Sequence, residues 1–436
     1  MAVSGQTKTN QSDASRNQRS TWRATLAALC LGLASHGAHA EGLQVLHWWK
    51  SASERSAVNL IVAKLSEENI VWRDGVIPSG SGVGAIIVLR SRILRQDAPE
   101  VALLNAVAIR DWAKLGLLVE LDSVATAGKW EQRMLPAMVP LTQWNGHFVT
   151  APVGIHRINN LYTNRKLFKQ YSLSVPTTWA EFERVAAKLQ QKGVVPLAQS
   201  SEPWQVATLF ETLIVAEGGA PFYRGLFLQG NEAAYASPKL AHALTRLRSL
   251  KQWMPNPILE QPWTAPTRAF ANGEAAMFIM GDWAKGELNA WGLATDEAFA
   301  CSAVPETGET HIYNIDSLAM LATGEVHRAA QEKLAAILLS PPIQSDYNQV
   351  KGSVPVLRNP VLAKMDSCAR ASWTLFASSA AARVPSLVHR NAADESIRDA
   401  VVAEIHRFFL DDSISVADTQ RRLAAIGRSI QKIDKQ

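Results

Sequence analysis

The sequence has little cysteine, no long apolar run after its N-terminal segment, and no large excess of charge. Only three cysteines occur among 436 residues, and no CxxC or HExxH pattern accompanies them. This excludes the common zinc motifs and a disulfide-dense scaffold. After the first 40 residues no stretch reaches the roughly twenty apolar residues needed to cross a bilayer. The 44 Lys and Arg residues nearly balance the 39 Asp and Glu residues, so the composition gives no reason to expect nucleic acid as a partner.

The first 40 residues have the pattern of a secretory signal. A polar start with four basic residues and one Asp precedes a short apolar segment that ends in Ala38-His39-Ala40, a small-x-small cleavage site. Leu29 stands before Cys30 where a lipobox requires a small residue, so we expect a soluble, exported product. Its 396 residues keep 40 basic and 38 acidic side chains once those four and one are removed. We therefore predict a periplasmic protein.

Two cysteines remain in that product, Cys301 and Cys368. In an exported protein an even pair is most simply one disulfide. No acidic loop has the spacing of a calcium site, so we expect neither a metal nor a cofactor.

Residues 272–287, NGEAAMFIMGDWAKGE, contain the most informative pattern in the chain. An apolar run over 275–280 without helical period predicts a fully covered strand, which Gly281 ends. Asp282 is expected to cap the next helix, which places Trp283 at the carboxyl end of a strand, where α/β proteins bind ligands. The indole face suits the C–H side of a sugar ring, although a Trp that only closes the strand–helix junction fits the pattern as well.

Strand and helix patterns alternate through the chain, as in an α/β fold. Residues 146–164 read as two extended pieces around Ala151-Pro152-Val153-Gly154, which suits a hinge. We expect two lobes, each a mostly parallel sheet flanked by helices, joined by two or three crossing strands. One lobe is predicted from 41–150 plus about 300–345, and the other from 151–299 plus about 346–436.

Two adjacent tryptophans, Trp48 and Trp49, follow the first predicted strand. Neighbouring side chains on a strand point to opposite faces, so one of the pair should face solvent or a cleft unless the strand bends and buries both.

Several motifs in one order resemble the periplasmic glucose-binding proteins of bacterial ABC importers, within the family 1 extracellular solute-binding proteins. The resemblance extends from about residue 43 to about 430, and the motifs that carry it are HWW with Glu54, PEVALLNAVAIRDWAKLGLLVELD at 99–122, His156-Arg157, PTTW at 176–179, Pro203-Trp204, residues 272–287, YNIDS at 313–317, KGSVP at 351–355 and SLVH at 386–389.

The resemblance implies a two-lobed periplasmic-binding-protein fold that closes on a monosaccharide and delivers it to an inner-membrane permease, acting as a monomer without catalysis. It implies stacking by three tryptophans, polar contacts from six further residues, and a disulfide: Trp48, Trp49 and Trp283; Glu54, Asn105, Asn314, Asp316, Lys351 and His389; Cys301 with Cys368. From their local sequence alone, Glu54 fits a helix N-terminal acid, Lys351 a solvated loop lysine, and His389 a capping or surface residue.

Two positions depart from the pattern of the glucose-binding proteins, Lys50 in HWWKSASE and Asn105 where a lysine is expected. If Lys50 pointed into the cleft, an acidic sugar or a differently substituted hexose would be favoured over glucose. Two other functions remain open at this stage: a secreted glycoside hydrolase, for which Glu54, Asp282 and Asp316 supply carboxylates, and a sugar sensor that serves chemotaxis or signalling.

Overall fold

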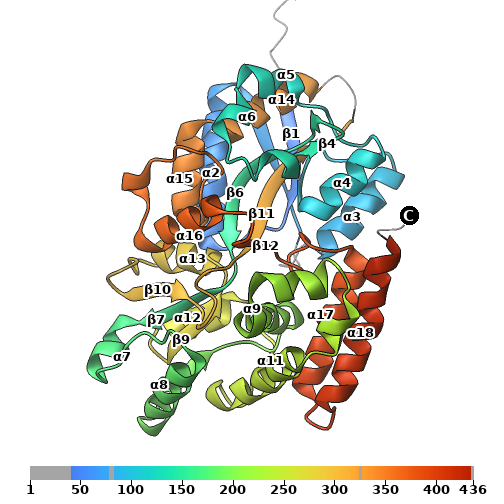
Figure 1. Cartoon of the computed structure of the whole chain (residues 1–436). Coiled ribbons are helices and arrows are strands. Elements are labelled where there is room, and N and C mark those ends of the chain that lie inside the picture. Colours follow the sequence, from blue (N-terminus) through green and yellow to red (C-terminus); the bar gives the residue numbers. More distant parts are fainter. Residues whose placement is uncertain (1–40, 78–82, 324–326, 434–436) are drawn as a thin grey trace, which may run out of the picture. The chain divides into compact units, whose positions relative to one another are not determined.

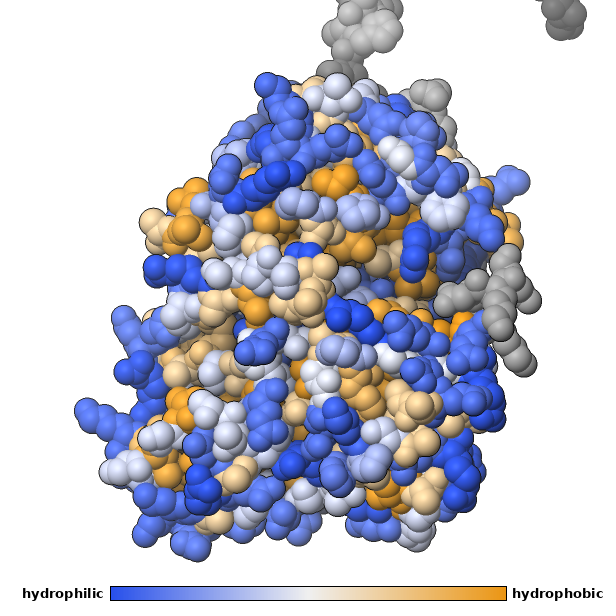
Figure 2. Space-filling view, viewed as in Figure 1, coloured by the Kyte–Doolittle hydropathy of each residue, from blue (hydrophilic) through white to orange (hydrophobic). Residues whose placement is uncertain are grey.

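In the computed structural model, residues 41–77, 83–323 and 327–433 are described; the predicted signal segment lies outside them. Residues 42–436 form one compact unit, which carries the fold (Figure 1). Within the described residues, no helix is both long and apolar enough to cross a membrane. On the face shown in Figure 2, hydrophilic residues surround smaller apolar areas near the middle.

Two lobes, each with its own hydrophobic core, make up this unit. The first lobe begins with the elements β1 (Glu41–His47), α2 (Ala52–Glu67), β2 (Ile70–Val76), α3 (Val83–Leu94), β3 (Val101–Leu104), α4 (Ala106–Lys114), α5 (Asp122–Ala127), α6 (Trp130–Arg133), β4 (Gln143–Trp144), β5 (His147–Phe148) and β6 (Ala151–Arg157). Its later elements are β11 (His311–Met320), α14 (Arg328–Leu338), α15 (Pro341–Lys351) and α16 (Ser367–Ser378).

The second lobe follows β6 and is completed by the C-terminal helices. Its elements are β7 (Asn160–Asn164), α7 (Arg165–Gln170), α8 (Trp179–Gln191), β8 (Val195–Ala198), α9 (Pro203–Phe227), α10 (Glu232–Tyr235), α11 (Pro238–Ser249), α12 (Thr264–Ala271), β9 (Ala275–Met280), α13 (Trp283–Ala290), β10 (Phe299–Ala303), α17 (Glu395–Leu410) and α18 (Val416–Ile433). The predicted strand over 275–280 is confirmed as β9, and all six of its residues are buried.

Both sheets are mixed, which corrects the expectation of mostly parallel sheets. In the first, ordered β12-β11-β3-β1-β2 with β12 at Arg383–Pro385, β11 runs antiparallel to β3 and to β6. In the second, ordered β10-β7-β9-β8, only β8 and β9 are parallel. The α/β two-lobed fold is confirmed, but β7 runs antiparallel to β9 and β10, and β11 runs antiparallel to β3 and β6 while it is parallel to β12.

The chain passes between the two cores three times within the described residues. Buried side chains change core between Ile155 and Ile158, between Ile312 and Ile315, and between Phe376 and Val384. Residues 347–376 pack into the core of the first lobe, so the predicted change of lobe near 346 falls about thirty residues early. In Figure 1, β6, β11 and β12 lie together where the lobes meet.

Local signals fix the elements that carry the cavity described below. Ser51 and Glu54 form a capping box at the start of α2, and Thr178 and Glu181 do the same for α8. Helix α15 ends at Gly352, whose φ of 96° is a left-handed value that favours glycine. A Cβ at Gly352 would lie 2.2 Å from the Asp282 carbonyl oxygen, so glycine is required there for α15 to approach α13.

The predicted disulfide between Cys301 and Cys368 is confirmed. It joins β10 in the second lobe to α16 on the first lobe's core, across a sequence separation of 67 residues. Lys285 and Asp366 form an ion pair of 2.8 Å on the same side of the junction. The lobes are therefore tied together on the side of α13, α15 and α16.

Candidate functional site

All nine side chains predicted to bind ligand line a single cavity of about 590 Å³, including its opening to solvent. The first lobe supplies residues from the ends of β1 and β3 and from α2, β6, β11 and α15, and the second supplies residues from α9, α13, α17 and the segment before α17. The lining is Trp48, Trp49, Glu54, Asn105, His156, Trp204, Trp263, Trp283, Asn314, Asp316, Lys351, Val388, His389, Arg390 and Arg398.

Aromatic rings from both lobes form much of the wall. Trp49 is buried and Trp48 is half-buried, and both follow the end of β1 at His47, so the strand does not dictate their directions. Trp283 and Trp204 lie with ring centroids 6.2 Å apart in the second lobe. Trp204 and Trp263 belong to the lining although the prediction did not include them; Pro203-Trp204 was a motif of the resemblance, which was the available signal.

Glu54 and Lys351 form a buried ion pair on the first lobe, with 3.1 Å between Oε1 and Nζ. The other Glu54 oxygen, Oε2, accepts the backbone N–H groups of Lys50 and Ser51. Burial alone would raise the pKa of Glu54, but Lys351 and these N–H groups hold it below its ordinary value. Burial would lower the pKa of Lys351, yet Glu54 and Asp316 raise it. Glu54 is thus a helix-capping acid and a cavity residue at once, while Lys351 is buried rather than solvated.

His156 lies between two carboxylates at the cavity wall. Its Nε2 is 3.2 Å from Oδ2 of Asp316, and its Nδ1 bonds Oδ1 of Asp282. In the register of β6 and β11, His156 stands opposite Asn314, which makes Asp316 its diagonal neighbour on the same face. Asp282 comes from the other sheet, at the end of β9, so this chain of side chains bridges the lobes.

The predicted capping role of Asp282 is wrong. Asp282 occupies the N-cap position of α13, but its side chain makes no bond to that helix. Its carboxylate instead accepts from His156 and, at 2.8 Å, from the backbone N–H of Arg157. A buried cation nearby is a stronger partner for a carboxylate than a helix N-terminus.

The two carboxylates determine the charge of His156. Burial alone would lower its pKa, but the charges of Asp282 and Asp316 outweigh burial and raise the pKa to about 9. Burial would raise the pKa of Asp316, whereas His156 and then Lys351 lower it to about 2. At neutral pH the group therefore contains an imidazolium and an ionised Asp316.

Amide side chains extend the hydrogen-bond network of His156 and Asp316 along the cavity wall. Asn105 and Asn391 both donate to Oδ1 of Asn314, at 2.6 and 2.8 Å, and Asn314 donates to Asp316 at 3.2 Å. Trp49 donates its indole N–H to the same carboxylate at 3.3 Å. The cavity floor is held by bonds between elements that lie far apart in the sequence.

His389 stands on the second-lobe wall, with its ring 5.2 Å from that of Trp283 and 5.9 Å from that of Trp204. Its Nδ1 is 2.8 Å from Oγ of Ser386. Burial lowers the pKa of His389, and Glu211 opposes this only in part. His389 is therefore neutral where His156 is charged.

Four further lining residues escaped prediction, His156, Val388, Arg390 and Arg398. His156-Arg157 was a motif of the resemblance, expected to pair within the hinge or with a carboxylate rather than to bind ligand. No local pattern marks the two arginines as cavity residues. Lys50, by contrast, is exposed and does not line the cavity, so the condition for an acidic sugar at that position is not met.

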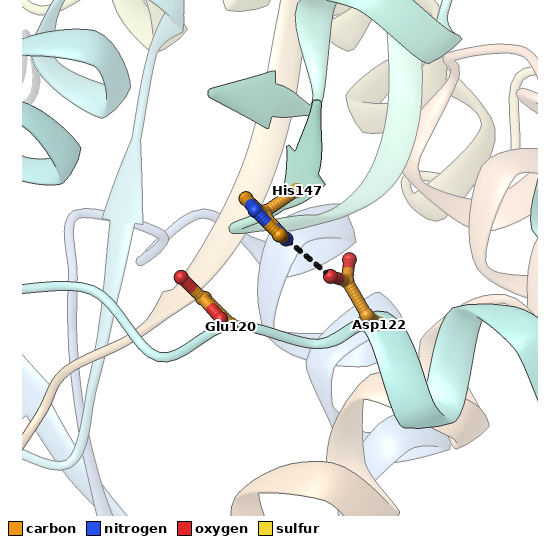
Figure 3. A group of neighbouring side chains, drawn as sticks. All are labelled: Glu120, Asp122 and His147. Carbon is orange, nitrogen blue, oxygen red and sulfur yellow. Dashed lines mark hydrogen bonds and ion pairs between the residues drawn. The ribbon is translucent and has the colours of Figure 1, made fainter. Parts of the chain in front are cut away.

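One group among the described residues could hold a metal ion, and it lies outside the cavity. Ligand atoms of Glu120, Asp122 and His147 fall within 4.8 Å of one another (Figure 3). Asp122 already bonds His147 at 2.6 Å and accepts the backbone N–H of Phe148. A partly exposed pair with its bonds satisfied is explained as a surface ion pair.

Comparisons with known proteins agree with this geometry. The bacterial extracellular solute-binding protein family matches residues 50–345. A probable sugar-binding periplasmic protein of Rhizobium meliloti is 30% identical over 413 residues, which cover 92% of this chain and 98% of the relative. Among solved structures, a chitin oligosaccharide binding protein has a TM-score of 0.75 at 16% identity, over 90% of this chain and 99% of the other. A bacterial solute receptor described as preferring β-D-galactopyranose exclusively has a TM-score of 0.75 at 15% identity, over 91% and 99%.

Proposed function

Because the chain belongs to family 1 of the bacterial extracellular solute-binding proteins, we propose that it is the sugar-binding component of an ABC importer. Its ligand is a monosaccharide, a glucose-like hexose, held in the cavity between the lobes. The observation that carries the proposal is the lining itself, in which aromatic faces and hydrogen-bonding groups come from both lobes. A ligand that contacts both lobes stabilises the closed arrangement.

The polar groups of the lining suit hydroxyls. A hydroxyl both donates and accepts, so carboxylates, an ammonium and amides can each be matched. The carboxylates of Glu54 and Asp316 and the ammonium of Lys351 would make charge-assisted bonds. The indoles of Trp49 and Trp283 would cover the C–H faces that hydroxyl bonding leaves exposed.

The charges of the lining favour a neutral sugar. Glu54 is paired with Lys351, and His156 lies between Asp282 and Asp316. The two arginines also have carboxylates close by, with Arg390 3.5 Å from Glu395 and Arg398 2.6 Å from Asp399. A ligand that carried its own charge would meet charged groups that already have partners of opposite sign.

One sugar ring fits the arrangement better than a chain of rings. The fold occurs in proteins described as binding either an oligosaccharide or a galactopyranose, so the fold alone does not fix ligand size. Here the polar groups gather on one floor, at Asn105, Asn314 and Asp316, with indoles on both lobes around it. A longer ligand would need several such sets of polar groups, one for each sugar ring.

The family is a transport component rather than an enzyme. The carboxylates that a hydrolase would use are already engaged, Glu54 with Lys351 and Asp316 with His156. We further propose that the protein is exported by a signal removed after Ala40, acts as a monomer in the periplasm, and hands its sugar to the membrane permease of the importer.

The test uses the chain from Glu41 onward and a panel of neutral hexoses, pentoses, disaccharides and uronic acids. A ligand that binds only the folded state adds about 4 kcal/mol of stability at a thousandfold excess over Kd. We expect a clear rise in Tm with one neutral hexose and none with glucuronate, and calorimetry then gives the affinity. If no sugar raises Tm, the proposal fails.

Matched tryptophan variants place the ligand. Trp283→Ala removes a lining indole and should abolish the sugar-induced rise in Tm, measured against that variant's own baseline. Trp291→Ala changes an indole at the end of α13 that does not line the cavity and lies instead against Arg268. The control should keep the full sugar-induced rise; its loss in both variants would contradict the assignment of the cavity.

A further inference from the structure

The segment that carries His389 is held from below by a buried carboxylate. Residues 386–391 connect β12 to α17 and bring His389 and Arg390 to the cavity. Glu211, on α9, is 1% exposed and lies under this segment. Its Oε1 accepts from the Ser386 hydroxyl at 2.7 Å and its Oε2 from the Leu387 backbone N–H at 3.1 Å. The Tyr223 hydroxyl lies 2.8 Å from Oε2 and 2.9 Å from the Pro385 carbonyl oxygen, so its one proton is shared between these two acceptors.

These contacts determine which atom donates in each bond. A carboxylate accepts hydrogen bonds, and the Ser386 hydroxyl donates to Oε1 of Glu211. The single proton of the Ser386 hydroxyl is therefore used by Glu211. The same Oγ lies 2.8 Å from Nδ1 of His389, and with its proton already committed it can only accept there. The proton between Ser386 and His389 consequently belongs to Nδ1.

A neutral imidazole carries one proton, so a proton on Nδ1 leaves Nε2 with a free lone pair. Among the residues that the structure describes, none is a hydrogen-bond partner of this Nε2. The ring lines the cavity and is confined between Trp204 and Trp283. The backbone N–H of His389 also donates to Ser386, which holds the ring and its segment to one hydroxyl.

We propose that Glu211 and Ser386 are positioning residues that hold His389 in its Nδ1–H tautomer, so that Nε2 offers the cavity a hydrogen-bond acceptor. The proposal rests on the proposed function in one respect, that the group bound there is a sugar hydroxyl. On that basis, the ligand must donate a hydrogen bond from an O–H to Nε2 of His389. A fluorine or a methyl ether at the same place cannot donate, and such an analogue loses the bond.

The tautomer can be observed directly without any ligand. In a protein with 15N-labelled histidine, a ring nitrogen that carries a proton resonates well apart from one that does not. The spectrum of His389→Gln identifies the His389 signals by their loss. We expect Nδ1 protonated and Nε2 unprotonated in the wild type; the reverse pattern overturns the proposal.

Variants of the two positioning residues test the cause. Ser386→Ala removes the acceptor for Nδ1–H, and Glu211→Gln gives Ser386 a partner that can donate as well as accept. Each should shift His389 toward a mixture of tautomers. Glu217→Gln is the matched control, because Glu217 also lies on α9 but pairs with Arg246 at 3.4 Å, away from the cavity. Unchanged His389 signals in both test variants would contradict the proposal, and the wild-type spectrum decides it even if a variant does not fold.

A binding cycle tests the demand for a donor. D-glucose and its monodeoxyfluoro analogues are titrated into the wild type and into His389→Ala. We expect one analogue to bind the wild type about tenfold more weakly than glucose, the worth of one hydrogen bond, and to match glucose in His389→Ala. If every analogue still binds the variant more weakly than glucose by the same factor, no sugar hydroxyl donates a hydrogen bond to His389. If no sugar binds at all, the proposed function fails, while the ring-nitrogen spectrum still decides the tautomer.

Discussion

Two histidines line the same cavity, and at neutral pH one is charged while the other is neutral. His156, on the first lobe, lies between Asp282 and Asp316, and its pKa is raised to about 9. His389, on the second lobe, faces the hydroxyl of Ser386 and two indoles, and burial lowers its pKa. Both rings are largely removed from water, so desolvation alone does not separate them.

The difference comes from how close the nearest carboxylates are. Two of them bond directly to His156, whereas the one nearest to His389, Glu211, is 3.8 Å away and is satisfied by other donors. The first lobe therefore offers the ligand a floor of fixed charges. The second lobe offers a neutral acceptor between aromatic faces. Four experiments test this contrast.

The largest effect is expected from His156→Gln. The substitution removes the cation between two buried carboxylates, and breaking a buried pair in this way costs about 3 to 5 kcal/mol. Urea unfolding of both proteins measures the loss. His147→Gln serves as the control, since its pair with Asp122 is at the surface and should leave the midpoint unchanged. Equal stability of His156→Gln and the wild type would show that His156 carries no charge between the two carboxylates.

The second effect is a pH dependence with a definite sign. The pKa of His156 is higher in the folded state than its ordinary value of 6.5, so its stabilisation is complete below pH 6.5 and is lost as pH rises through about 9. The loss amounts to ~3 kcal/mol for a shift of this size. Unfolding free energy measured from pH 6 to 10 should fall more steeply for the wild type than for His156→Gln. Parallel curves would contradict the raised pKa.

His389 should make a smaller contribution to the pH dependence of the unfolding free energy, with the opposite sign. Its pKa is lowered on folding, so the unfolded chain binds a proton more readily and stability falls as pH drops below 6.5. In His389→Gln that part of the acid destabilisation disappears. The difference in unfolding free energy between variant and wild type, followed from pH 7 to 5, measures it. A difference that grows in the other direction would mean that His389 is charged in the folded protein.

The smallest effect is expected from Lys50→Ser. Lys50 is exposed and outside the lining, so its charge contributes to the cavity wall of neither lobe. Calorimetry should give the same sugar affinity within about twofold, because charges at exposed positions interact weakly. A large change in the preference between glucose and glucuronate would show that Lys50 contacts the bound ligand.

Much of the fold and the candidate site could be predicted from the sequence because the relevant signals are local. The strand at Ala275–Met280 is a continuous apolar run, and the start of α8 is marked by Thr178 and Glu181. Motifs of the resemblance identified the predicted binding residues, which all line one cavity. Their binding role stays a prediction until a sugar is measured.

The rest depends on contacts between distant residues. His156 meets carboxylates 126 and 160 positions away, and Ser386 meets Glu211 across 175. At Asp282 the local sequence is that of a helix cap, and nothing in it shows that an imidazole from another lobe competes for the carboxylate. The mixed sheets have the same origin, because strand direction follows from where a returning segment docks.

The three crossings between the lobes have a consequence for the order in which the chain can fold. The core of the first lobe takes buried side chains from Leu43 through Phe376, and that of the second from Ile158 through Ile430. A chain emerging from its N-terminus thus completes neither core until most of its length is available, and contacts of such long sequence separation also form slowly. For a protein proposed to work outside the cytoplasm, both cores would therefore be completed only after most of the chain has left the membrane.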